Sequence, residues 1–254
     1  MRLITYNILD GAIRTLPEIT KIVQNEKPDY LTLNEANTFA NENSKILKQF
    51  ARETGFPYFD IALSGEHNYH VAVFSKYPFK EIHKLQPLAR ACFIGLIDSP
   101  LGELSVASLH LTPASEDKRN PEIDLIVSFQ NRYGSRILTG DMNSLSRYDE
   151  YDQGMIKDFN EVQIGKFTTE GKLRFDAIDK ILSAGYFDAA VQLKKNKERT
   201  VPTPVNKDIA HAQMRLDYFF LSHSLLTHLE EYAVLKNDLT NKASDHYPIL
   251  VELR

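Results

Sequence analysis

Polar side chains suited to phosphate chemistry recur along this sequence, and several of them stand at the end of a short apolar run. Hydrolysis of a phosphate ester needs a cation at the phosphoryl oxygens, a group that orients or deprotonates water, and a group that steadies the leaving oxygen. Carboxylates, imidazoles and amides can supply all three. The candidate side chains are Asn7, Glu35, His110, Asp141, Asn143, Asp217, Asp245 and His246.

The oxygen donors in this set indicate which cation would bind. Carboxylate and amide oxygens are the ligands that Mg²⁺ prefers, with Mn²⁺ as a second possibility. Cys92 is the only cysteine, and no histidine-rich cluster is present. Both facts argue against a zinc-dependent hydrolase.

The apolar runs that carry these residues have the length and the β-rich composition of strands. Strands are predicted at residues 3–6, 30–33, 71–74, 91–97, 104–109, 137–139, 216–221 and 249–252. Apolar residues at helical spacing predict helices at 17–27, 44–54, 121–131 and 175–184. This mixture predicts an α/β fold, a two-sheet β-sandwich flanked by helices on both outer faces.

The bulk composition bounds the remaining possibilities. The chain has 254 residues, 43% hydrophobic and 25% charged, and contains no long linker, which predicts a single globular domain over residues 1–254. Its first residues form no long apolar run, so we expect no signal peptide, no membrane span and a cytoplasmic location. The net charge of −4 disfavours nucleic-acid binding by bulk attraction alone.

Six short motifs occur in a fixed order across residues 5–248. They are Thr5-Tyr6-Asn7, Leu33-Asn34-Glu35, Ser108-Leu109-His110, Gly140-Asp141-Met142-Asn143, Arg215-Leu216-Asp217-Tyr218 and Ser244-Asp245-His246-Tyr247-Pro248. Together they resemble the endonuclease/exonuclease/phosphatase superfamily, whose fold is that of deoxyribonuclease I. Two positions differ from the usual pattern, because Asn34 stands where the family more often has glutamine and Tyr6 where nuclease branches often have tryptophan.

The resemblance implies a metal site built from three residues. Glu35 is similar to the principal metal ligand of the family, with Asn7 beside it. Asp245 resembles the carboxylate that approaches the same ion or a second one.

The resemblance also implies catalytic roles for five residues. His246 resembles the imidazole that contacts the scissile phosphate, and Asp217 the carboxylate that orients it. Asp141 is similar to the residue that activates water, and Asn143 to the amide that holds the phosphate. His110 resembles a second phosphate-facing histidine that other branches replace with tyrosine.

Each of these residues also has a structural alternative. The pair 245–246 and the segment 140–143 both suit ordinary turns, and Asn7 could cap the turn that follows it. Glu35 alone could be a solvent-facing acid, and His110 could be a hydrogen-bonded structural histidine. The functional interpretation rests on their occurrence together.

Three other features leave two interpretations open. Arg215 could face a phosphate, but we favour pairing with an acid on the sheet. The basic run 194–199 could grip a substrate backbone, although a solvated loop is the favoured interpretation. Residues 144–172 are predicted to form a long loop with little regular structure, whose aromatic residues either stack on bases or pack the loop onto itself: Tyr148, Tyr151 and Phe167.

The sequence therefore predicts a Mg²⁺-dependent phosphoesterase, with a nuclease or phosphodiesterase acting on DNA or RNA as the leading hypothesis. The acidic net charge favours the alternative, a phosphatase or phosphodiesterase that acts on a small or lipid-derived phosphate ester. A binding module that kept the fold and lost the chemistry is disfavoured, because all eight candidate positions are chemically competent.

Overall fold

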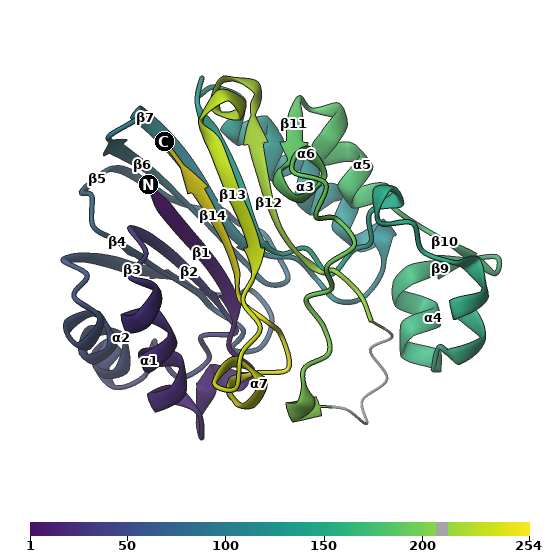
Figure 1. Ribbon diagram of the computed structural model, residues 1–254, viewed down its shortest axis with the longest axis horizontal. Coiled ribbons are helices and arrows are strands. Elements are labelled where there is room, and N and C mark those ends of the chain that lie inside the picture. The colour runs from purple at the N-terminus through teal and green to yellow at the C-terminus, as the bar shows by residue number, and fades with distance from the viewer. Residues whose placement is uncertain (207–212) are drawn as a thin grey trace.

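A computed structural model describes residues 1–206 and 213–254, which form two stacked six-stranded sheets (Figure 1). The first sheet has the order β13-β14-β1-β2-β4-β3, with β1 (Arg2–Asn7), β2 (Tyr30–Asn34), β3 (Tyr58–Ala62), β4 (Val71–Ser75), β13 (Leu229–Val234) and β14 (Ile249–Leu253). The second has the order β11-β12-β8-β7-β6-β5, with β5 (Phe79–Lys84), β6 (Ala91–Ser99), β7 (Gly102–His110), β8 (Arg136–Asp141), β11 (Tyr186–Asp188) and β12 (Asp217–Ser222).

Helices cover the outer face of each sheet (Figure 1). On the first sheet lie α1 (Leu16–Glu26) and α2 (Asn41–Thr54), and on the second lie α3 (Glu116–Gln130) and α5 (Asp176–Ser183). Two four-residue helices, α6 (Ala189–Gln192) and α7 (Thr240–Ala243), lie in connections. The predicted α/β sandwich with helices on both outer faces is confirmed.

The sandwich forms because the strands alternate between two apolar environments. In β14, Ile249, Val251 and Leu253 face the core between the sheets, whereas Leu250 faces the layer of α1 and α2. Successive side chains of a strand point to opposite faces of its sheet. Strands that are apolar on both faces can therefore be buried between the second sheet and a helix layer.

The prediction of a loop at 144–172 is wrong, because this part of the chain has regular structure. It contains α4 (Glu161–Phe167) and the hairpin β9 (Thr168–Thr169) and β10 (Lys172–Leu173), preceded by 3₁₀ turns at Arg147–Asp149 and Gln153–Asp158. Asn160 and Gln163 form a capping box at the start of α4, a signal present in the sequence. We call residues 144–173 the insert.

Two aromatic residues of the insert, Phe159 and Phe167, pack it onto the sandwich, whereas Tyr148 is 50% exposed. Phe167 is fully buried and Phe159 is 8% exposed, in a cluster with Leu145, Val201 and Leu216. Packing, rather than stacking on bases, is therefore the role that the structure gives Phe167.

The basic run at 194–199 contacts the insert and the first sheet. Lys195 Nζ donates to the carbonyl oxygen of Tyr232 at 2.8 Å, and Arg199 donates to that of Asp149 at 2.9 Å. The run is thus a loop held by backbone carbonyls.

Within residues 1–206 and 213–254, no helix has the length and apolar content needed to cross a bilayer.

Candidate active site

The ends of strands from both sheets meet at one edge of the sandwich. In the second sheet His110, at the end of β7, pairs with Asp141 at the end of β8, and Asp141 pairs with Asp217 at the start of β12. In the first sheet Asn7 ends β1 opposite Asn34 of β2. Since β1 and β2 are parallel, as are β7 and β8, their carboxyl ends lie together, the usual place for a ligand site in α/β folds.

The predicted residues from the two sheets are in direct contact. Asn7 Nδ2 donates to Asp141 Oδ2 at 3.1 Å and to Glu35 Oε1 at 3.3 Å. The turn before β14 supplies the remaining pair, since Ser244 Oγ donates to the Asn7 carbonyl at 2.6 Å and thereby holds Asp245 and His246 beside β1. The structure therefore brings the residues predicted from the sequence into one cluster.

Asn34 joins the two sheets immediately beneath this cluster. Its Nδ2 donates to the Leu109 carbonyl at 2.8 Å, and its Oδ1 accepts from the Asp141 backbone N–H at 3.2 Å. The side chain is fully buried. Both ends of the amide are therefore used to set the spacing between β2 and the strands that carry His110 and Asp141.

We expect Asn34→Ala to lower the free energy of unfolding by about 2 kcal/mol, because it leaves a buried carbonyl and a buried N–H without their partner. Urea denaturation followed by circular dichroism measures this loss. The exposed Asn131→Ala is the matched control and should unfold like the wild type. Equal stability of the two variants would show that Asn34 does not join the sheets.

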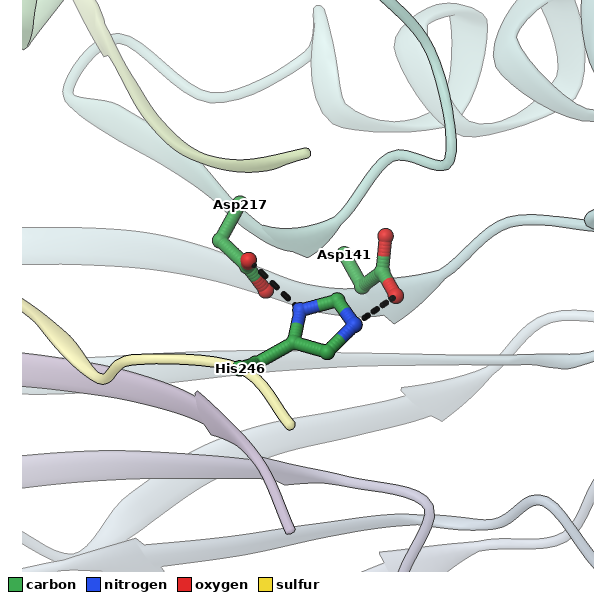
Figure 2. Close-up of side chains that lie close together, drawn as sticks. All are labelled: Asp141, Asp217 and His246. Atoms are coloured by element: carbon green, nitrogen blue, oxygen red, sulfur yellow. Dashed lines mark hydrogen bonds and ion pairs between the residues drawn. The ribbon is translucent and has the colours of Figure 1, made fainter. Parts of the chain in front are cut away.

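His246 lies between two carboxylates (Figure 2). Its Nδ1 is 2.8 Å from Asp217 Oδ2, and its Nε2 is 3.9 Å from Asp141 Oδ2. Burial disfavours the imidazolium, but the negative charges of Asp217 and Asp141 outweigh burial and raise the pKa of His246 to about 10. At neutral pH the ring therefore carries a positive charge, with Asp217 fixing its orientation.

Asp141 lies at the centre of the cluster and is 2% exposed. Burial opposes its ionisation, but the nearby positive charge of His246 outweighs that penalty, and the pKa of Asp141 is lowered. The side chain is therefore a carboxylate at neutral pH, able to accept a hydrogen bond from water.

His110 differs from His246 in its charge state. Burial lowers the pKa of His110 to about 4, so the ring is neutral at pH 7. Its Nε2 is 3.6 Å from Asp141 Oδ2, and within the described part of the chain its buried Nδ1 has no hydrogen-bond partner. The ring lies in the cluster, and its contact with a phosphate stays a prediction.

Glu35 follows β2 directly, in a left-handed backbone conformation with φ of 58°. Its carboxylate accepts hydrogen bonds from the Asp10 backbone N–H at 3.0 Å and from Asn7. Burial raises the pKa of Glu35, and the negative charge of Asp245 adds to this effect. A divalent cation between these oxygens would relieve that cost, so the donor set fits Mg²⁺ or Mn²⁺.

The amide of Asn7 is oriented differently from that of a metal ligand. Its nitrogen faces Glu35, and its oxygen accepts the Leu9 backbone N–H at 3.2 Å. Ligation through Asn7 Oδ1 would require rotation of this amide. Glu35 and Asp245 are therefore the stronger candidates.

A second arrangement could also hold a metal ion. Ligand atoms of Asp141, Asp217 and His246 all lie within 4.8 Å of one another, and all three residues are buried. Nδ1 of His246 is already in contact with Asp217 Oδ2 at 2.8 Å, so only Nε2 of the ring could face such an ion. A set of carboxylate oxygens fits Mg²⁺ better than one that includes an imidazole, so we favour the Glu35 side of the cluster for the cation.

Three side chains beside the cluster were not predicted from the sequence. Lys166 of α4 donates to Asn143 Oδ1, and burial lowers the pKa of Lys166 to about 8. The ring of Tyr69 meets that of His110 edge-on with centroids 6.4 Å apart, and the Arg90 guanidinium stacks 3.8 Å from the Tyr69 centroid. None of the three belongs to the six motifs, so the sequence carried no signal for them.

Arg215 does not face the cluster, in agreement with the favoured interpretation. It is fully buried and pairs with Asp149 of the insert and Asp188 of β11, each at 2.6 Å from Nη2. It holds the chain immediately before Asp217, so its role is structural.

Comparisons with known proteins identify the family of the chain. The model of the Endonuclease/Exonuclease/phosphatase family matches residues 4–246. Comparison with curated protein sequences finds no significant match.

Solved structures of similar proteins share the fold along the whole chain. An endonuclease/exonuclease/phosphatase family protein from Leptotrichia buccalis is 22% identical, with a TM-score of 0.71 and coverage of 100% of this chain and 99% of that one. A variant of the 3′ phosphatase NExo from Neisseria, bound to product DNA hairpin, is 17% identical with a TM-score of 0.73 and the same coverage. An AP endonuclease from Archaeoglobus fulgidus is 18% identical, with a TM-score of 0.73 and the same coverage.

At these identities the structural likeness establishes the fold, and the family model adds the sequence pattern over nearly the whole chain. The chain belongs to the endonuclease/exonuclease/phosphatase family.

Proposed function

We propose that this chain is a Mg²⁺- or Mn²⁺-dependent phosphodiesterase that hydrolyses nucleic acid. The observation that carries the proposal is the buried ring of His246, held between Asp217 and Asp141 at the edge where Glu35 stands. Two similar structures support a DNA substrate, since one is a 3′ phosphatase with a DNA hairpin product and the other an AP endonuclease.

Each residue of the cluster has a distinct task in this reaction. A divalent cation held by Glu35 and Asp245 would supply positive charge at the phosphoryl oxygens. The Asp141 carboxylate accepts a hydrogen bond from water and orients it for in-line attack on phosphorus. His246 donates from Nε2 to a phosphoryl oxygen as negative charge develops there, while Asp217 holds the ring. Asn143 and His110 donate to the other non-bridging oxygen. As the water oxygen bonds to phosphorus, the opposite P–O bond breaks, Asp141 takes the proton of the water, and the departing alkoxide takes up a proton from solvent.

One cation beside the site, Arg90, suits a polyanionic substrate despite the net charge of −4. Arg90 lines a cleft of about 480 Å³ together with Thr112 and Gly165 of α4, and the carboxylates of Glu66 and Glu161 line the same cleft. A guanidinium at such a place suits a flanking phosphate of a nucleic-acid strand. The acidic total charge instead favours the alternative, a small or lipid-derived phosphate ester.

We expect hydrolysis of a nucleic-acid substrate that requires Mg²⁺ or Mn²⁺, falls to background with a chelator, and returns when the metal is restored. The panel contains single- and double-stranded DNA, RNA, an abasic duplex, a 3′-phosphorylated duplex, inositol phosphates and an aryl phosphodiester. Glu35→Ala should be inactive with the fold intact, and the exposed Glu53→Ala is its matched control.

Turnover of the small esters alone would replace the nuclease proposal with the alternative. Full activity of Glu35→Ala, or activity unaffected by chelation, would contradict a metal-dependent mechanism at this site.

A further inference from the structure

Lys166 extends to the cluster from helix α4 of the insert, whereas most of the other residues stand at the ends of strands. It is 8% exposed, and its ammonium donates to Asn143 Oδ1. Its backbone is held as well, because the fully buried Arg119 donates to the Lys166 carbonyl at 2.6 Å. The side chain and the main chain of Lys166 are thus both fixed.

Asn143 is constrained on three sides as a result. Its backbone N–H donates to Asp141 Oδ1 at 2.8 Å, and its Nδ2 donates to the Leu111 carbonyl at 2.9 Å. Rotation of the amide by half a turn would set its NH₂ group against the Lys166 ammonium and its oxygen against the Leu111 carbonyl. Two repulsive contacts therefore disfavour the rotated form.

One Nδ2 proton of Asn143 remains after the bond to Leu111, since a primary amide carries two. A phosphate bound beside Asp141 could accept that proton only while the amide keeps the observed orientation. An apolar side chain of similar volume would fill the space of Lys166 without the cost of burying an ammonium. The charge at this position therefore has a use beyond packing.

We propose that Lys166 is a positioning residue that fixes the Asn143 amide so that its free Nδ2 proton is directed at the phosphate of the substrate. This inference rests on the proposed function, because it assigns Asn143 a phosphate to bind.

The kinetic test is a double-mutant cycle with the substrate found above. Lys166→Met should lower kcat by about 10- to 100-fold and leave KM within about threefold, as is usual when a residue that orients a catalytic group is lost. Lys166→Arg should recover part of the activity. In the Asn143→Ala background Lys166→Met should have no further effect, because the residue acts through Asn143.

Lys172→Met is the matched control, an exposed lysine of the same insert, and should behave like the wild type. Wild-type kcat in Lys166→Met, or effects of the two substitutions that simply multiply, would overturn the inference. If Lys166→Met does not fold, Lys166→Ala, which also lacks a donor, replaces it, and the same cycle applies.

A second readout does not depend on activity. The side-chain amide resonances of Asn143, identified by their loss in Asn143→Ala, should move in Lys166→Met and stay in place in Lys172→Met. Unchanged Asn143 resonances in Lys166→Met would overturn the inference even in an active enzyme. A wild type that is inactive on every substrate would contradict the proposed function, while the resonances would still decide whether Lys166 orients the amide.

Discussion

Replacement of His246 by alanine should lower kcat for phosphate-ester hydrolysis by about 10³-fold, with little change in KM. The variant loses a buried imidazolium whose charge is maintained by Asp217 and Asp141. His110 cannot take over this role, because burial lowers the pKa of His110 to about 4 and keeps its ring neutral. Steady-state kinetics with the Mg²⁺-loaded protein measures the effect.

The control for His246→Ala must separate chemistry from folding, because the substitution leaves two buried carboxylates without their cation. Circular dichroism and the thermal midpoint report the fold, and His246→Gln retains a donor of similar size. The exposed His223→Ala should be fully active. A folded His246→Ala with kcat within about threefold of the wild type would remove His246 from the mechanism.

Arg215→Met should lower the free energy of unfolding by about 3–5 kcal/mol, the range expected when one partner of a buried ion pair is lost. Its guanidinium bonds to both Asp149 and Asp188, and all three side chains are at most 2% exposed. Without it, two carboxylates remain buried, and no other cation among residues 1–206 and 213–254 pairs with them. Urea denaturation at neutral pH measures the loss.

Two further variants test the reason for that loss. Arg147→Met removes an exposed ion pair with Asp179 and should cost less than about 1 kcal/mol. Adding Asp149→Asn and Asp188→Asn to Arg215→Met should recover part of the stability, since no buried charge is then left. No recovery in the triple variant would show that packing around Arg215, and not its charge, holds this region.

Position within the sheets decided which strands the sequence could predict. The runs at 71–74 and 249–252 became β4 and β14, which lie inside the first sheet and are apolar on both faces. Within the two six-stranded sheets, the strands that were not predicted are the edges β3, β5, β11 and β13. In β5 most residues are exposed, because an edge strand here buries little surface and its sequence shows no apolar run.

The candidate site divides in the same way. Glu35 and Asp141 stand at the ends of apolar strands, and these strands could be predicted from the sequence. The positions of the two residues could therefore be predicted as well. Lys166 and Arg90 come from the insert and from a loop, where no periodicity relates sequence distance to spatial distance. Their proximity to the cluster depends on tertiary packing, which cannot be predicted from local sequence patterns.

The first and last strands of the sandwich are hydrogen-bonded neighbours, with Arg2 opposite Glu252 and Thr5 opposite Ile249. The cluster therefore combines Asn7 and His246, which are widely separated in the sequence. Contacts of such high sequence separation raise the contact order and slow folding, because a long loop must close before they form. Because Asp245 and His246 directly precede β14, a chain in which β14 has not docked lacks a complete cluster, so the onset of the proposed hydrolysis would report that docking.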